Sequence, residues 1–192
     1  ITNRMICVHL NFVIFTDCGR VKVVIKEKVQ NVLNAQINKE FYSAYLYLAM
    51  SAYFDEVGLF GFANWTKVQA REEMDHGMII FNYIIERDGT VELSHIESPE
   101  RDFSSTLQVF ERILEHEKFV TESINCVASM SEDECDLATR HFINWYISEQ
   151  VEEEANARDV IDKLNLFGDD ETALYLLDKE LGERKYKEHF YN

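Results

Sequence analysis

The sequence predicts an all-α protein: a four-helix bundle with a long crossover loop between its second and third helices and a short fifth helix near the C-terminal end. The 192 residues include only one proline and seven glycines, so long regular elements should outnumber turns. Apolar residues recur at alternating spacings of three and four along four long stretches. A mid-chain segment without this period separates the second stretch from the third, which is the connection of a bundle with one crossover.

The first helix is expected over about residues 26–54. Residues spaced alternately by four and three form its seam, the stripe that packs against the other helices. Glu40 lies inside this otherwise uncharged line, where a leucine would be expected. The seam comprises Leu33, Ile37, Glu40, Ala44, Tyr47 and Ser51.

The second helix is expected over about residues 59–87. Gly58 interrupts the first pattern, and Gly89 can adopt the left-handed conformation that ends a helix. Residues 89–104 keep no period and contain glycine, serine and proline, so they form the crossover loop. The inward side of the second helix includes Glu73, His76, Ile80 and Tyr83.

The third helix is expected over about residues 105–130 and the fourth over about 134–166. Glu117 interrupts the apolar seam of the third helix. Gln150 and Glu153 take two seam positions of the fourth. Both helices therefore repeat the pattern of the first, with polar side chains on a stripe that should face the interior.

Two further segments lie toward the ends of the chain. Acidic residues 169–171 suit the positive N-terminus of a short fifth helix that runs to about residue 184. Residues 1–24 form, in our prediction, an N-terminal extension outside the domain that need not be ordered, and residues 25–192 form the domain. The extension contains an apolar run too short to span a bilayer. This run could instead be a signal-peptide core, although no small-residue cleavage site follows it.

The charge and the cysteines narrow the range of partners. The formal net charge of −16 repels nucleic acids and anionic membranes and attracts cations. The four cysteines form no C-x-x-C pair, and a chain of this length needs no disulfide framework to fold. We therefore expect free thiols, a cytoplasmic location, and no nucleic-acid or membrane partner.

Each of the four long helices places a residue of metal-ligand type on its inward stripe. Taken singly, such a residue is more often paired or reaching toward solvent. A group of buried, unpaired carboxylates would cost several kcal/mol each, so the four helices together imply a shared cation. Two helices with single glutamates beside an E-x-x-H helix are typical of di-iron carboxylate proteins. The candidate ligands are Glu40, Glu73, His76, Glu117, Gln150 and Glu153.

The ligand types indicate which metal the site would take. Carboxylate oxygens with one imidazole and no thiolate suit Fe(II), with Mn(II) or Zn(II) as surrogates. The alternative from a different functional class is a non-catalytic bundle, either a storage subunit without oxidation or an interaction scaffold. Stoichiometric iron binding separates the two classes.

Several stretches resemble the bacterial-type non-haem ferritins. NKEFYSAYLYLAMSAY (38–53), REEMDH (71–76) and INWYISEQVEEE (143–154) resemble the first, second and fourth helices of that family. The resemblance extends from about residue 26 to the C-terminus and includes ESP (97–99) in the crossover. It implies the ferritin-like fold for the whole domain.

The resemblance also implies a ferroxidase centre with two irons and the residues that bind them. Glu40, Glu73 and His76 match the ligands of the first iron. Glu73 matches the bridge to a second iron, which Glu117 and, more loosely, Gln150 would also hold. These five residues would carry the catalytic reaction.

Other positions match residues that surround this centre in the family. Tyr47 matches a tyrosine beside the two irons, and Trp145 matches an aromatic residue nearby. The chain lacks the second E-x-x-H motif of bacterioferritins, with Gln150 and Glu153 in its place, so no haem is expected. A possible third iron site would use the matching carboxylates Glu72, Glu149, Glu152 and Glu153.

The resemblance implies iron storage and detoxification by a ferroxidase. Fe(II) would be oxidised by O₂ or peroxide and stored as a ferric oxyhydroxide mineral inside a homo-oligomeric shell of twenty-four subunits. A rubrerythrin-like peroxidase would need a rubredoxin-like cysteine site, which the sequence lacks. A mini-ferritin would lack the fifth helix.

Overall fold

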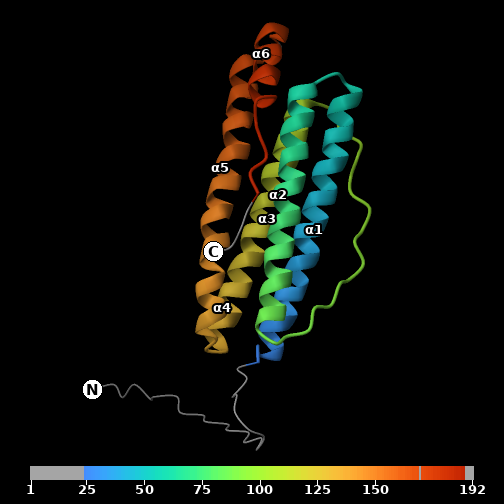
Figure 1. Ribbon diagram of the computed structural model, residues 1–192. Coiled ribbons are helices and arrows are strands. Elements are labelled where there is room, and N and C mark those ends of the chain that lie inside the picture. Colours follow the sequence, from blue (N-terminus) through green and yellow to red (C-terminus); the bar gives the residue numbers. More distant parts are fainter. Residues whose placement is uncertain (1–23, 169, 189–192) are drawn as a thin grey trace, which may run out of the picture.

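The computed structural model describes residues 24–168 and 170–188, which contain six helices and no strand. The long helices lie side by side as a bundle (Figure 1), which confirms the predicted fold class. The predicted extension, residues 1–24, lies outside the described residues apart from Val24. The helices are α1 (Glu27–Glu56), α2 (Phe60–Glu86), α3 (Thr106–Asp133), α4 (Leu137–Phe142), α5 (Asn144–Phe167) and α6 (Glu171–Leu181).

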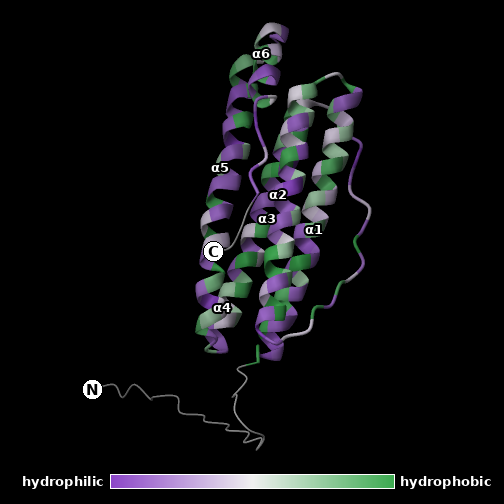
Figure 2. Ribbon diagram, viewed as in Figure 1, coloured by the Kyte–Doolittle hydropathy of each residue, from purple (hydrophilic) through white to green (hydrophobic). Residues whose placement is uncertain are grey.

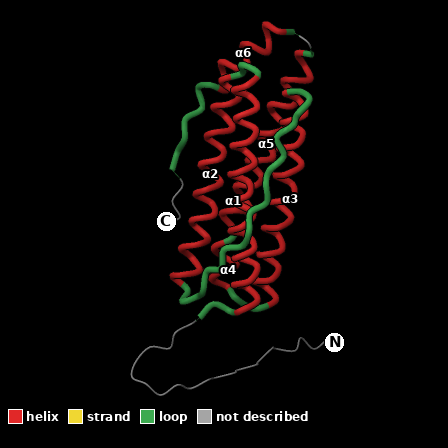
Figure 3. Tube along the Cα trace, turned by 90° about the vertical axis from the view of Figure 1, so that its right-hand side faces the viewer, coloured by secondary structure: helices red, strands yellow, loops and turns green. Residues whose placement is uncertain are grey.

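The crossover loop runs the length of the bundle along α1 (Figures 1 and 3). Polar side chains of α1 hold its first residues. The Asn34 side chain donates to Thr90 O at 3.0 Å and accepts from Glu92 N at 3.0 Å, and Gln30 Oε1 accepts from Thr90 N at 2.8 Å. The loop therefore returns the chain to the end of the bundle where α2 began, as predicted from its length.

The fourth bundle helix differs in detail from the expected single helix over about 134–166. It begins three residues later, at Leu137, because Asp136 caps it by accepting a hydrogen bond from Thr139 N at 3.1 Å. It is also divided into α4 and α5 at Ile143. Hydrogen bonds from Ile143 N to Thr139 O and from Ile147 N to Ile143 O cross this division at 3.0 and 3.1 Å. The two segments therefore act as one helix of the bundle.

The apolar core is divided into two clusters, one at each end of the bundle. Between them lies a layer of buried polar residues contributed by α1, α2, α3 and α5. Hydropathy colouring shows hydrophilic residues along much of α5 (Figure 2). The α6-end cluster includes Leu46, Met50, Phe54, Phe62 and Phe110. The α4-end cluster includes Val29, Leu33, Ile84, Ile124 and Phe142.

Helix α6 closes one end of the bundle by docking on the start of α2. Leu59, which precedes α2, provides no side-chain cap. Asp178 of α6 provides one instead, because its Oδ1 accepts from Gly61 N at 2.7 Å and from Phe62 N at 3.1 Å. A carboxylate at a helix N-terminus also interacts favourably with the helix dipole. None of the helices within the described ranges is both long and apolar enough to cross a membrane.

Gly61→Ala should displace α6 from α2. A Cβ atom at Gly61 would lie 1.6 Å from the backbone oxygen of Asp178, so the two helices must separate. We expect a loss of about 3 kcal/mol in the free energy of unfolding, measured by chemical denaturation. Gly182→Ala is the matched control, because its nearest contacts lie at 3.4 Å. Equal stability of the two variants would contradict this account of the α2–α6 contact.

Candidate metal centre

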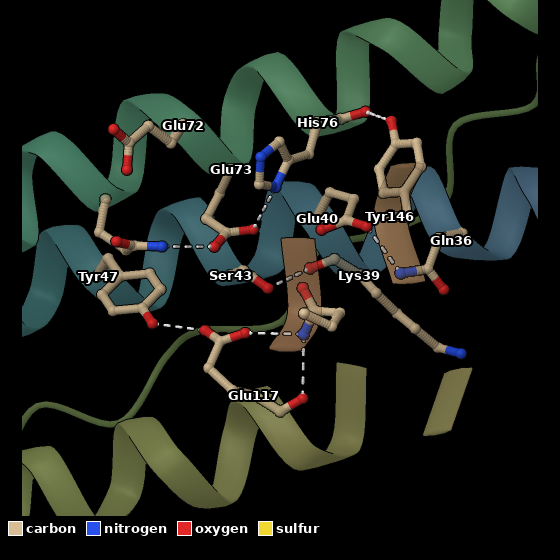
Figure 4. Close-up of polar contacts among 12 residues, drawn as sticks. Gln36, Lys39, Glu40, Ser43, Tyr47, Glu72, Glu73, His76, Glu117 and Tyr146 are labelled. Atoms are coloured by element: carbon tan, nitrogen blue, oxygen red, sulfur yellow. Dashed lines mark hydrogen bonds and ion pairs between the residues drawn. The ribbon is translucent and has the colours of Figure 1, made fainter. Parts of the chain in front are cut away.

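The polar layer between the two apolar clusters contains the six candidate ligands predicted from the sequence. They come from four helices at mid-bundle, and the four that Figure 4 labels point toward one another. Each retains between 1% and 5% of its accessible surface. Helical periodicity explains this convergence, since each residue lies in the seam of its own helix. The six are Glu40, Glu73, His76, Glu117, Gln150 and Glu153.

Glu40, Glu73 and His76 have the geometry of a metal-binding group. One ligand atom from each lies within 4.8 Å of the other two. Glu73 Oε2 lies 3.5 Å from His76 Nδ1, because residues three apart share one face of α2. The donors are carboxylate oxygens and an imidazole nitrogen, which suit iron, manganese or zinc. Cys126 and Cys135 are exposed and lie outside this group.

Glu117 approaches the same layer from α3. Tyr47 donates its hydroxyl proton to Glu117 Oε1 at 2.5 Å, and Gln150 Nε2 donates to Glu117 Oε2 at 3.1 Å. Gln150 also donates to the backbone oxygen of Glu117 at 3.2 Å. The Gln150 amide nitrogen is therefore used within the protein, and its Oε1 is the atom with which it can bind a metal.

Two buried glutamines, which the sequence reasoning missed, orient the carboxylates. Gln36 Nε2 donates to Glu40 Oε1 at 2.8 Å, and Gln69 Nε2 donates to Glu73 Oε1 at 3.2 Å. Each glutamine precedes its glutamate by four residues. This spacing was the available sequence signal, because such residues are neighbours on a helix. Within the described part of the chain, Gln69 Oε1 is buried and has no hydrogen-bond partner.

A chain of hydrogen bonds extends from Glu40 toward the surface through Gln36. Ser123 on α3 donates to Gln36 Oε1 at 2.5 Å, and the Lys39 ammonium donates to Ser123 Oγ. Gln36 therefore has a fixed amide orientation, with its N–H directed at Glu40. Such outer partners orient metal ligands and raise metal affinity in other proteins.

Burial and mutual repulsion shift the proton equilibria of the centre. Desolvation is the largest cause, followed by a neighbouring carboxylate, and together they raise the pKa of each of four glutamates from 4.5 to about 8. Burial and the nearby Glu117 charge also raise the pKa of the Tyr47 hydroxyl. A bound cation would replace these protons and lower the cost of the buried charges. The four glutamates are Glu40, Glu73, Glu117 and Glu153.

Two aromatic side chains of α5, Trp145 and Tyr146, contact His76. Tyr146 donates its hydroxyl proton to the backbone oxygen of His76 at 2.6 Å. The Trp145 ring meets the imidazole edge to face at 5.3 Å between centroids. Trp145 therefore lies beside the candidate centre, as expected, and in contact with His76.

The carboxylates expected at a third site line a cavity of about 690 Å³ between α2 and α5. Glu72 and Glu153 are buried, Glu149 is half-buried and Glu152 is exposed. Arg184 also lines this cavity, and its guanidinium forms an ion pair with Glu72. Arg184 was not predicted, because no local sequence pattern connects it with a residue more than one hundred positions away.

The sequence of the domain is similar to known proteins over most of its length. The family model for the ferritin-like domain matches residues 30–167, a range that contains the whole predicted centre and ends before Arg184. The bacterial non-heme ferritin of Bacteroides fragilis is 39% identical over 161 residues, which are 84% of this chain and 100% of that protein. The bacterial non-heme ferritin of Campylobacter jejuni is 42% identical over 156 residues, 81% of this chain and 93% of that protein.

Solved structures share the fold at still higher sequence identity. An open-pore ferritin from the hyperthermophilic archaeon Archaeoglobus fulgidus has a TM-score of 0.83 and 50% identity, covering 84% of this chain and 98% of its own. A closed form of that ferritin, engineered by mutagenesis, has a TM-score of 0.84 and 49% identity, covering 85% and 99%.

The raised pKa of Glu40 predicts how pH affects the metal-free protein. The folded state holds a proton on Glu40 up to about pH 8, whereas the unfolded chain loses it near 4.5. The free energy of unfolding should therefore fall as the pH rises through this window. Glu40→Gln cannot ionise and should exceed wild type by at least about 1 kcal/mol at pH 8, the equivalent of one pKa unit, with no gain near pH 5.

Denaturation by guanidinium in the presence of a chelator measures this difference. Glu56→Gln is the control, because Glu56 is exposed at the end of α1, and it should match wild type at both pH values. A Glu40→Gln variant that loses stability with pH as steeply as wild type would show that Glu40 is already ionised in the metal-free fold.

Proposed function

The chain belongs to the bacterial non-haem ferritins, a family of iron-storage proteins, and we propose that it oxidises Fe(II) to Fe(III) at the buried centre of each subunit. The observation that carries this proposal is the convergence of Glu40, Glu73 and His76 within 4.8 Å in a layer closed off by apolar residues. Such an arrangement is costly unless cations neutralise it. Iron is the metal that the family stores, and Fe(II) is the divalent form that would enter the centre.

We assign five residues to two iron positions. Glu40, Glu73 and His76 bind the first iron, and Glu73 bridges to the second, which Glu117 and the Gln150 amide oxygen also bind. Hard oxygen ligands favour Fe(III) over Fe(II), so the centre becomes more complementary to the metal as it is oxidised. The Gln36 and Gln69 amides keep the Glu40 and Glu73 carboxylates in position.

The reaction proposed for this pair is balanced as follows. Two Fe(II) each give one electron to O₂, which takes up two protons and leaves as H₂O₂; with peroxide as oxidant, the same two electrons and two protons yield water. Each Fe(III) then reacts with two water molecules to form ferric oxyhydroxide and release three protons. Two metals about 3.5–4 Å apart are suited to such a two-electron step. Tyr47 donates its hydroxyl hydrogen bond to the carboxylate of Glu117, a proposed ligand of the second iron.

We propose a cytoplasmic homo-oligomeric shell of twenty-four subunits that holds the mineral. Zinc and manganese act as surrogates in the two iron positions, and no haem takes part. The cluster of Glu72, Glu149, Glu152 and Glu153 is proposed as a weaker third cation site.

Aerobic addition of Fe(II) to the metal-free protein tests the assignment. Wild type should oxidise about two Fe(II) per subunit rapidly, the capacity of a two-metal centre, and then form soluble mineral. The double variant Glu73→Gln, His76→Ala should lose the fast phase, measured as ferric absorbance after rapid mixing, and should bind less than one Zn(II) per subunit at the centre.

The crossover loop offers a matched control. Glu92 and His95 repeat the E-x-x-H spacing, but both are exposed and lie outside the helices. The double variant Glu92→Gln, His95→Ala should therefore retain the fast phase. If the α2 variant oxidises iron as rapidly as wild type, the centre is structural and the chain stores iron without oxidising it there.

Gln150→Glu tests the assignment of the second position. A carboxylate binds iron more tightly than a neutral amide, so the variant should retain Fe(III) at the centre and turn over more slowly. We expect the first turnover to stay fast and repeated turnovers to slow about ten-fold, the effect of roughly 1.4 kcal/mol. Gln150→Leu, which has no ligand oxygen, should instead weaken Zn(II) binding at the second position. Unchanged repeated turnover in Gln150→Glu would remove Gln150 from the mechanism.

A further inference from the structure

The segment after α6 turns back and lies along α2. Figure 1 shows it descending from α6 between α5 and α2. Asn64 Nδ2 donates to the backbone oxygen of Arg184 at 3.0 Å, and the Tyr186 hydroxyl donates to Asp75 Oδ2 at 2.6 Å. The Arg71 guanidinium lies 5.7 Å from the centre of the Tyr186 ring. These contacts, spread over three turns of α2, fix the position of the segment.

This return places the side chain of Arg184 beside the proposed third cation site. Its guanidinium is paired with Glu72 and lies 4.6 Å from the centre of the Trp65 ring. The side chain is 21% exposed, and that of Glu72 is 9% exposed. A guanidinium pairs strongly with a carboxylate and stacks on an aromatic face. Three interactions therefore hold Arg184: the ion pair with Glu72, the contact of its guanidinium with the Trp65 ring, and the hydrogen bond from Asn64 to its backbone oxygen.

A metal ion and the Arg184 guanidinium would use the same carboxylates. Glu72 Oε2 accepts from Arg184 Nη2, and Glu149, Glu152 and Glu153 line the same cavity. The positive charge of Arg184 also acts on Glu153. A metal ion in this cavity and the Arg184 guanidinium would repel each other, because both are positively charged and would contact the same carboxylates. A metal can therefore bind all four carboxylates only if the Arg184 side chain moves away from Glu72.

We infer that Arg184 is the resident counter-ion of the Glu72, Glu149, Glu152 and Glu153 cluster, and that a metal ion binds there only in competition with it. This inference rests on the proposed ferroxidase function and concerns metal stoichiometry. The subunit then holds two metals tightly at the centre and a third weakly. Because the metal must displace the Arg184–Glu72 pair, removing that pair should raise the affinity for the third metal about 10- to 100-fold.

Calorimetric titration of the metal-free protein with Zn(II) tests this directly and needs no oxidation. Wild type should bind two ions tightly and a third at least ten-fold more weakly. Arg184→Gln should tighten the third ion at least ten-fold and leave the other two unchanged. Arg184→Lys, which keeps a positive charge but not the planar fork, should fall between them. Arg184→Lys also keeps the test usable if Arg184→Gln folds poorly, because the lysine retains a positive charge near Glu72.

Two controls test whether the tighter binding of the third ion is specific to Arg184 and to this carboxylate cluster. Arg158→Gln removes an arginine from an exposed pair with Glu154 on α5 and should behave as wild type. The double variant Glu149→Gln, Arg184→Gln should lose the tightened third ion, which locates that ion in this cluster. The inference is overturned if wild type binds three ions equally, or if the third affinity is the same in wild type and Arg184→Gln. Failure of wild type to bind any ion tightly would overturn the proposed function as well.

Discussion

The structure depends on one unfavourable arrangement: four glutamates, one from each helix of the bundle, meet inside a buried layer. Their mutual repulsion and desolvation oppose folding of the metal-free chain. Several features of the fold reduce this cost. Gln36 and Gln69 donate to Glu40 and Glu73, Tyr47 donates to Glu117, and apolar clusters on both sides supply favourable burial. A cation bound among these carboxylates would therefore stabilise the fold as well as complete the site.

The sequence predicted that the candidate ligands meet inside the bundle, because their positions follow from helix geometry alone. A residue in the seam of a long helix faces the interior whatever its chemistry, so the period of the seam was enough to place Glu40 and Glu117 inside the bundle. The division at Ile143 could not be predicted, because hydrogen bonds continue across it and no glycine or proline marks it. The same helix starts at Leu137, three residues beyond the expected boundary, because Asp136 caps it.

Contacts between distant segments were beyond sequence reasoning for a different reason. Ser123 and Lys39 meet only because α1 and α3 adopt one relative rotation. Arg184 reaches Glu72 only because the chain turns back after α6. Neither contact corresponds to a periodic pattern or a fixed residue spacing in the sequence. The pairing of Gln36 with Glu40 did leave one, a separation of four residues on one helix, and similar glutamine–glutamate pairs can be sought in other bundles.

The division of the apolar core into two clusters has a consequence for cooperativity. A bundle with one continuous core opens as a unit, whereas two cores joined by a polar layer can open separately. In the metal-free subunit the two clusters are connected through hydrogen-bonded polar side chains rather than through apolar contacts. The proposed pair of metals would be held by residues of four helices and would therefore join the two halves. The iron that the protein stores would thus make each subunit a single folding unit.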